Sequence, residues 1–218
     1  MNETVKTKLA AWGLQPDAES LNRLELFAAS LLEKNAVQNL VSKNDEPLLW
    51  ERHILDSLAA AALLRRLLPA GALVADAGSG AGFPGLVLAA VLPEYQFELL
   101  DSRSKRCDFL TWAAAAMGCS NVKVFQRRLG EGGAAAGTKY SAVTERAMGQ
   151  LENILPQCLN ILDKGGFFLA WQSAAQVAQR RPAVEDAQSA SRARLLETFA
   201  YRLPAEAEDR HIMIFRKS

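Results

Sequence analysis

The sequence predicts an α/β fold in which a mostly parallel, seven-stranded sheet follows an N-terminal helical extension. From residue 73 onward, short apolar runs alternate with helical stretches, which is the pattern of a parallel, doubly wound sheet. Residues 1–70 instead carry apolar side chains at three- and four-residue intervals, as an amphipathic helix does. The chain has 218 residues, of which 50% are hydrophobic, and is long enough for a full core. We expect a helical extension at 1–70 and a second domain at 71–218.

The helical extension is expected to contain two main helical segments. The first starts at Pro16-Asp17, and its apolar face is most simply a core face packed against the following domain; it contains Leu21, Leu24, Ala28, Leu31 and Leu32. The second starts at Pro47, after a polar break at 39–42, and carries His53 and Asp56 three residues apart. That spacing is compatible with a packed hydrogen-bonding pair or with a chemical role.

A glycine-rich turn follows the first predicted strand, in the stretch Asp76-Ala77-Gly78-Ser79-Gly80-Ala81-Gly82-Phe83-Pro84-Gly85. Glycine has no β-carbon, so the backbone of such a turn can approach a ligand, and a helix starting near Pro84 would direct its free N–H groups at that ligand. A dinucleotide motif requires glycine where Phe83 stands, and a P-loop requires a Gly-Lys-Ser or Gly-Lys-Thr that does not follow. The spacing is typical of S-adenosylmethionine (SAM) methyltransferases, with a dehydrogenase or a purely structural turn as alternatives.

The next two strands supply further candidate cofactor contacts. The second strand, 96–101, ends at Asp101, about twenty residues beyond the glycines, where such folds place a carboxylate on ribose hydroxyls. The third strand, 121–125, is followed by Leu129 and Gly130, which are candidate adenine contacts because that loop lies beside the cofactor in this architecture.

The rest of the chain is expected to complete the sheet. A fourth strand at 140–144 is followed by Arg146, which would face the methyl-transfer site because ligands gather at the carboxyl ends of the strands. After it we expect, in order, a helix at 151–162, a turn at 164–166, a fifth strand at 167–171, a mainly helical stretch from 172 to about 196, and an antiparallel pair at 198–203 and 211–215.

Charge and cysteine usage narrow the class of protein. A formal net charge of +1 argues against a protein that coats nucleic acid with its whole surface, but it leaves room for a local cationic patch. The candidates are Arg103, Lys105, Arg106, Arg127 and Arg128, which form either a solvated helix start or a phosphate-contacting surface. The three widely spaced cysteines and the lack of a long apolar run predict a cytoplasmic protein without a disulfide framework, zinc site or membrane span.

Taken together, these motifs resemble the bacterial 16S ribosomal RNA guanine N-7 methyltransferase family called RsmG or GidB. The matching stretches are 39–42, Arg52-His53-Ile54-Leu55-Asp56-Ser57, 76–86, Leu99-Leu100-Asp101-Ser102 with Lys105-Arg106, and Arg146-Ala147. The resemblance implies a SAM-dependent α/β enzyme that modifies a guanine in the 530 loop of small-subunit rRNA, with SAM contacts at Gly78, Phe83, Leu129, Gly130 and Arg146. Two positions depart from the family pattern: Gly130, where an acidic residue is common, and Trp171-Gln172, where lysine-glycine is common.

Methylation at guanine N-7 needs no general base, because this nitrogen carries a lone pair and no proton. The sequence agrees with that chemistry, since it has neither an Asn-Pro-Pro-Tyr type motif nor a Pro-Cys nucleophile. We therefore predict that Arg146 is the catalytic residue, that Gly80 and Asp101 join the SAM site, and that a monomer acts on 16S rRNA or the small ribosomal subunit. The alternatives are a small-molecule methyltransferase, an RNA-binding member of the fold without turnover, and a nicotinamide oxidoreductase.

Overall fold

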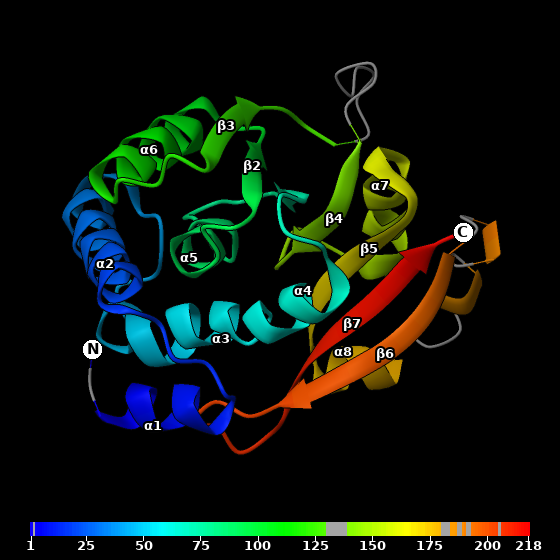
Figure 1. Ribbon diagram of the computed structural model, residues 1–218, viewed down its shortest axis with the longest axis horizontal. Helices are drawn as coiled ribbons and strands as arrows, with labels where there is room; N and C mark the ends of the chain where they lie inside the picture. Colours follow the sequence, from blue (N-terminus) through cyan, green and yellow to red (C-terminus); the bar gives the residue numbers. More distant parts are fainter. Residues whose placement is uncertain (2, 130–138, 180–183, 187–188, 191–192, 205) are drawn as a thin grey trace.

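A seven-stranded sheet forms the centre of the computed structural model, with helices on both of its faces (Figure 1). The structure describes residues 1, 3–129, 139–179, 184–186, 189–190, 193–204 and 206–218. The strand order is β3-β2-β1-β4-β5-β7-β6, so the chain starts in the middle of the sheet, moves to one edge and then crosses to the other. Ligands of open α/β sheets bind at the carboxyl ends of the strands, where the strand order reverses.

The predicted mostly parallel sheet is confirmed. Its strands are β1 (Leu73–Ala77), β2 (Gln96–Asp101), β3 (Val122–Gln126), β4 (Tyr140–Glu145), β5 (Leu162–Ser173), β6 (Ala193–Tyr201) and β7 (Arg210–Lys217). β1 to β5 pair in parallel, whereas β7 runs antiparallel to both β5 and β6. The second strand has the bounds that the sequence predicts, 96–101.

The segment before β1 is helical, as expected. It contains α1 (Glu3–Ala11), α2 (Ala18–Gln38), a short 3-10 helix (Glu46–Leu48), a π-helix (Leu49–Ile54), α3 (Leu55–Leu58) and α4 (Ala61–Leu67). Asp17 caps α2 by accepting the Ser20 N–H at 2.7 Å, which explains why the helix starts where the sequence suggests. The later helices are α5 (Gly85–Val91), α6 (Ser104–Ala116), α7 (Leu151–Ile161) and α8 (Ala174–Gln179).

Two sequence-based expectations about the last third of the chain are wrong, the first of them in part. The expected, mainly helical stretch from 172 to about 196 is helical at α8, 184–186 and 189–190 among its described residues, but 172–173 belong to β5 and 193–196 belong to β6. Burial alternates along the whole of β6, but Leu196 lies at an exposed position and Glu197 at a half-buried one, so apolar and polar residues do not alternate in the sequence there. The expected turn at 164–166 is a bulge within β5, because Tyr140 and Ala142 of β4 pair with Leu162 and Phe167.

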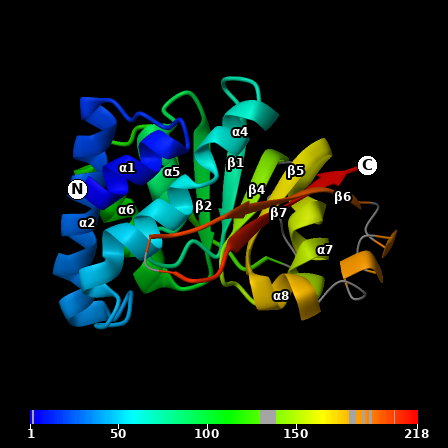
Figure 2. The ribbon, with the colours of Figure 1, turned by 90° about the horizontal axis from the view of Figure 1, so that it is seen from below.

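The two faces of the sheet carry two separate apolar cores. The N-terminal helices, α5 and α6 pack on one face, with buried side chains that include Phe27, Leu55, Leu86 and Leu110. α7 packs on the other face against β4, β5 and β7. Figure 2 shows this layering, with α1, α2, α5 and α6 on one side of the strands and α7 and α8 on the other. Among the described residues, no helix combines the length and apolar character needed to cross a bilayer.

Candidate active site

The glycine turn is held in place by the strand next to it. The N–H groups of Gly78 and Ser79 both donate to the carbonyl of Leu100 in β2, at 2.8 and 3.1 Å. Gly78, Gly80 and Gly82 have φ values of 66°, 58° and 93°, a backbone region that favours glycine. The turn is therefore a fixed loop at the carboxyl edge of β1, directly beside the end of β2.

Asp101 connects the turn to the end of β2, as its position in the sequence predicts. Its Oδ2 accepts the Gly80 N–H and its Oδ1 accepts the Arg103 N–H, both at 2.9 Å, and Arg106 Nη1 lies 3.5 Å from Oδ2. Each carboxylate oxygen has two acceptor sites, so Oδ1, which accepts one bond, retains capacity for a ligand hydroxyl group. The partly exposed backbone of Gly78 and Gly80 beside this acceptor fits the ribose and amino-acid ends of SAM.

Met148 covers part of the turn. A β-carbon at Gly78 would lie 2.9 Å from Met148 Cγ, so this side chain packs directly on the glycine backbone. Met148 reaches this position because its own N–H donates to the buried Glu145 carboxylate and because Ala147 adopts a φ of 64°. The loop after β4 therefore folds back over β1.

Arg146 lies in that loop and is held on three sides. Its Nη1 donates to Asp56 Oδ2 at 2.8 Å, its Nη2 lies 3.3 Å from His53 Nδ1, and its guanidinium stacks 4.7 Å from the Phe83 ring centre. His53 also stacks on Phe83, with ring centres 5.2 Å apart. The N-terminal helices, the glycine turn and the loop after β4 thus meet at the guanidinium of Arg146, whose side chain is 15% exposed.

Asp56 is the centre of a larger network. Its side chain is 0% exposed and is bonded to Arg146, to the Tyr201 hydroxyl group of β6 and to Arg210 of β7, whose Nη1 lies 3.2 Å from Oδ1. The indole N–H of Trp171, in β5, donates to the Asp56 carbonyl at 3.1 Å. A buried carboxylate is stable only when it is paired and hydrogen-bonded, and here two arginines and a phenol meet that requirement.

His53 is kept neutral by its surroundings. Burial, with the Arg146 charge as the second cause, lowers the pKa of His53 from 6.5 to about 4. An arginine offers only donors, so Nδ1 of the neutral ring must be the acceptor of the Arg146 contact and the proton lies on Nε2. Asp45 Oδ2 lies 3.7 Å from that Nε2.

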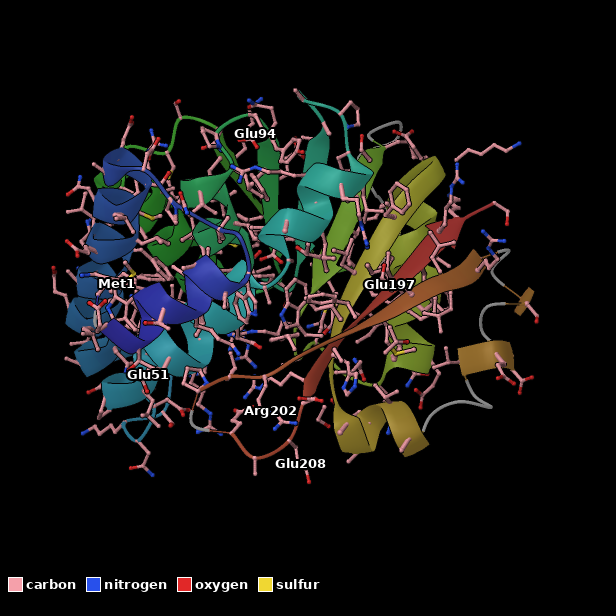
Figure 3. All side chains as sticks on the ribbon, turned by 60° about the horizontal axis from the view of Figure 1, so that its bottom comes forward. Met1, Glu51, Glu94, Glu197, Arg202 and Glu208 are labelled. Atoms are coloured by element: carbon pink, nitrogen blue, oxygen red, sulfur yellow. The ribbon has the colours of Figure 1, made fainter. Side chains whose placement is uncertain are left out.

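A cavity of about 320 Å³ opens at the carboxyl edge of β4 and β5, bordered by Arg146 and the Asp56 network. Its other walls come from Gln172 at the end of β5, Gln176 in α8 and the β6–β7 connection. Figure 3 shows two residues of that connection, Arg202 and Glu208, close to α8. The volume lies within the range of small-ligand pockets.

Some of the predicted cofactor-binding residues lie at the glycine turn, and others do not. Gly78, Gly80 and Asp101 lie together at the turn. Phe83 is only 5% exposed and packs beneath Arg146, and the half-buried Leu129 packs against the α7 core. Gly130 lies outside the described residues.

The predicted cationic residues lie around Asp101 at the carboxyl edge of β2 and β3. Arg103, Lys105 and Arg106 line a hollow of about 440 Å³ between the start of α6 and the end of α2. The Arg127 N–H donates to the Asp101 carbonyl at 2.8 Å, and the side chain of Arg128 is exposed. Arg106 is ion-paired with Asp101 and therefore belongs to the turn as much as to this surface.

Sequence reasoning left the roles of His53 and Asp56 open and missed Tyr201, Arg210 and Gln172. The Tyr201–Asp56 contact spans 145 positions in the sequence, so no local spacing could indicate it. At the position where lysine-glycine is common in the family, this chain has Trp171-Gln172. Trp171 is not a cation, and its indole N–H donates to the Asp56 carbonyl.

The sheet order and the glycine turn joined to Asp101 define the class of protein, the SAM-dependent methyltransferases. The fold is similar to that of a SAM-dependent O-methyltransferase from Thermotoga maritima, with a TM-score of 0.55, 18% identity, and coverage of 74% of this chain and 64% of that one.

The chain belongs to the rRNA small subunit methyltransferase G (GidB) family, whose model matches residues 20–212. A ribosomal RNA small subunit methyltransferase G from Halorhodospira halophila is 40% identical over 166 residues, which cover 76% of each chain. One from Listeria welshimeri is 29% identical over 218 residues, or 99% of this chain and 90% of the relative. The family match removes the nicotinamide oxidoreductase alternative.

We expect Asp56→Asn to lower the free energy of unfolding by about 3–5 kcal/mol, because Arg146 and Arg210 would lose the buried charge between them. Tyr201→Phe is the matched control, since it removes one hydrogen bond from the same carboxylate and keeps its charge, at a cost of about 2 kcal/mol. Urea unfolding of the three proteins measures both values. If Asp56→Asn costs no more than Tyr201→Phe, the charge does not organise this network.

Acidification should destabilise the protein through His53. Between pH 6.5 and pH 4 the unfolded chain takes up a proton on this residue and the folded chain does not, so the free energy of unfolding falls as pH falls. Burial raises the pKa of Asp76 to about 6, which acts in the opposite direction in the same window. The quantity to measure is therefore the difference between wild type and His53→Gln, whose amide oxygen can still accept from Arg146. As pH falls, the variant should lose less free energy of unfolding through this site than the wild type does. Parallel curves of unfolding free energy against pH would contradict the neutral state assigned to His53.

Proposed function

We propose that the protein transfers the methyl group of SAM to N-7 of a guanine in the 530 loop of 16S rRNA. Membership of the methyltransferase G family supports the rRNA substrate. The choice of guanine, of N-7 and of the loop follows from the motif resemblance, above all the arginine-histidine block joined to a glycine turn that continues Phe83-Pro84-Gly85. The observation that carries the chemistry is the position of Arg146, between the glycine turn and the cavity.

The cofactor is proposed to lie along the carboxyl edge of β1 and β2. In this arrangement the backbone from Gly78 to Gly82 holds its amino-acid end, Asp101 accepts from the ribose hydroxyl groups, and the loop with Leu129 and Gly130 borders the adenine. SAM supplies a methyl group on a sulfonium, which a neutral nitrogen lone pair can take directly. The sulfonium end would then point toward Arg146 and the cavity.

The charged groups of the cavity suit a reaction that needs no base. Among the carboxylates that border the cavity, Asp56 is held by Arg146 and Arg210, Glu206 by Arg210, and Asp209 by Arg202. Glu208 also borders it, is exposed and forms no ion pair with a described residue. Carboxylates fixed in this way are poorly placed to remove a proton, but they are suited to stabilise the positive charge that a guanine gains at N-7. The reaction as proposed uses no metal ion and takes place on a cytoplasmic monomer.

Arg146 is proposed to select and align the base. A guanidinium carries five N–H donors, and the contacts to Asp56 and His53 use two of them. A remaining donor can bond guanine O6, which lies next to N-7, and leave the N-7 lone pair free for the methyl group. Adenine presents an amino group at that place, so the same donor would reject it.

The decisive experiment uses 16S rRNA in small subunits, with and without 7-deazaguanosine at the target position. Labelled methyl transfer from SAM to the unmodified subunit should yield 7-methylguanosine in the 530 loop, found by chain cleavage at the modified base. The 7-deaza substrate lacks the nucleophile and should receive no label. Transfer to the 7-deaza base, or to another nucleotide, would refute the proposed position, and absence of transfer to any rRNA would refute the substrate.

Arg146→Ala should lower kcat/KM for rRNA by about 100-fold or more, because the base loses its alignment with the methyl group. The fold should survive, since Asp56 keeps its contacts with Arg210 and Tyr201. Arg65→Ala is a suitable control, because Arg65 pairs with Glu94 at the surface and lies outside the site. Unchanged turnover in Arg146→Ala would remove this residue from the catalytic machinery.

A further inference from the structure

Five cationic side chains gather at the edge of the sheet opposite the candidate active site. We call them the amino-edge patch: Lys139, Lys164, Arg194, Arg216 and Lys217. Four of them, all except Lys139, line a hollow of about 510 Å³. The patch lies where β5 and β6 begin and β7 ends, and Figure 1 shows the end of β7 far from the β6–β7 connection that borders the cavity.

Within the described part of the chain, none of these five side chains forms an ion pair with an acidic residue. Lys139 donates to the Asn160 carbonyl, and Lys217 donates to the carbonyls of Leu159 and Leu162. Burial, followed by the charge on Lys139, lowers the pKa of Lys217. Asp163 is the acidic side chain that acts on Lys217, and it is exposed. Asp163 therefore offsets part of the positive charge of the patch, but it forms no ion pair with any of the five cations.

Two of the arginines face each other across paired strands. Arg194 of β6 lies directly opposite Arg216 of β7, and both side chains are exposed. Like charges at such positions destabilise a sheet, and no described acidic side chain separates them. Arg216 is also oriented, because its Nε lies 3.4 Å from the Gly165 carbonyl and its guanidinium lies 5.9 Å from the Phe167 ring centre.

The carboxyl edge of the sheet is arranged differently. There Arg106 is paired with Asp101, and Arg146 and Arg210 are paired with Asp56. In the amino-edge patch, by contrast, Lys139, Arg216 and Lys217 donate to backbone carbonyls, and no ion pair is formed by Lys164 or Arg194 within the described residues. Since the whole chain has a net charge of only +1, this excess is local.

We infer that the amino-edge patch binds backbone phosphates of the substrate RNA outside the target loop. The inference rests on the proposed function, because it adds a second contact surface for the same substrate. β7 extends from Arg210 at the cavity to Lys217 at the patch, which corresponds to roughly 23 Å of strand. An RNA that fills the cavity must therefore extend well beyond the methylated nucleotide to contact the patch. Arginine forks and lysine ammonium groups are the side chains that recognise phosphate.

The test compares a double variant, Lys164→Ala with Arg194→Ala, with a charge-matched control, Lys6→Ala with Lys123→Ala. All four side chains are exposed, and both proteins lose two positive charges. The patch variant should bind small subunits or full-length 16S rRNA about tenfold more weakly at physiological salt. The slope of log affinity against log salt should also fall by about 1.4–1.8 for two lost phosphate contacts. The control should retain wild-type affinity for long RNA.

Two further readouts separate this inference from the proposed function. Affinity for S-adenosylhomocysteine, and methylation of a short hairpin that contains only the target loop, should be equal in the patch variant and wild type. Arg194→Glu should also weaken the binding of long RNA. Its melting temperature should rise or stay constant, because a glutamate opposite Arg216 replaces a repulsive pair with an ion pair.

Equal affinity and equal salt slope in patch variant and control would overturn the inference and leave the proposed function intact. The inference also fails if the variant loses binding to vesicles of anionic lipid but keeps its binding to RNA. If wild type methylates no rRNA, the proposed function fails, whereas the affinity measurements still decide whether the patch binds RNA.

Discussion

The burial of one carboxylate, Asp56, constrains the whole candidate site. A charge with no exposed surface needs partners, and these come from the loop after β4, from β6 and from β7, while Trp171 of β5 fixes the main chain. The N-terminal helices therefore contribute the central residue of a network whose other members belong to the sheet. Arg146 has these contacts only when the elements are packed together, so the cavity depends on the packing of the helical extension against the sheet.

The features that could be predicted from the sequence are those that depend on local sequence patterns. The strands from β1 to β4 are short apolar runs, and the ends of β1 and β2 necessarily meet at one edge, which is why the sequence alone places Asp101 beside the glycines. The first half of β6 could not be recognised, because Leu196 lies at an exposed position and Glu197 at a half-buried one, so apolar and polar residues do not alternate there. The Asp56 network was equally hidden, since tertiary packing alone brings Tyr201 and Arg210 to a helix that lies far away in the sequence.

Under the proposed function, the two edges of the sheet contact the RNA in different ways. At the carboxyl edge, Asp56 and Asp101 fix Arg146, Arg210 and Arg106 in defined directions, which suits the alignment of a single base. At the amino edge, cations remain without such partners, which suits the sequence-independent attraction of a phosphate backbone. A chain of nearly neutral overall charge can thus present a precise site and a general anchor on opposite sides of one sheet.

The contact of Met148 with Gly78 has a consequence for turnover. The donor is consumed in every cycle, so its demethylated product must leave the glycine backbone before a fresh molecule can enter. The side chain that packs on Gly78 is a flexible thioether, which can change rotamer without disturbing any strand. Its rotation would uncover Gly78 while the Asp56 network that holds Arg146 stays assembled from one cycle to the next.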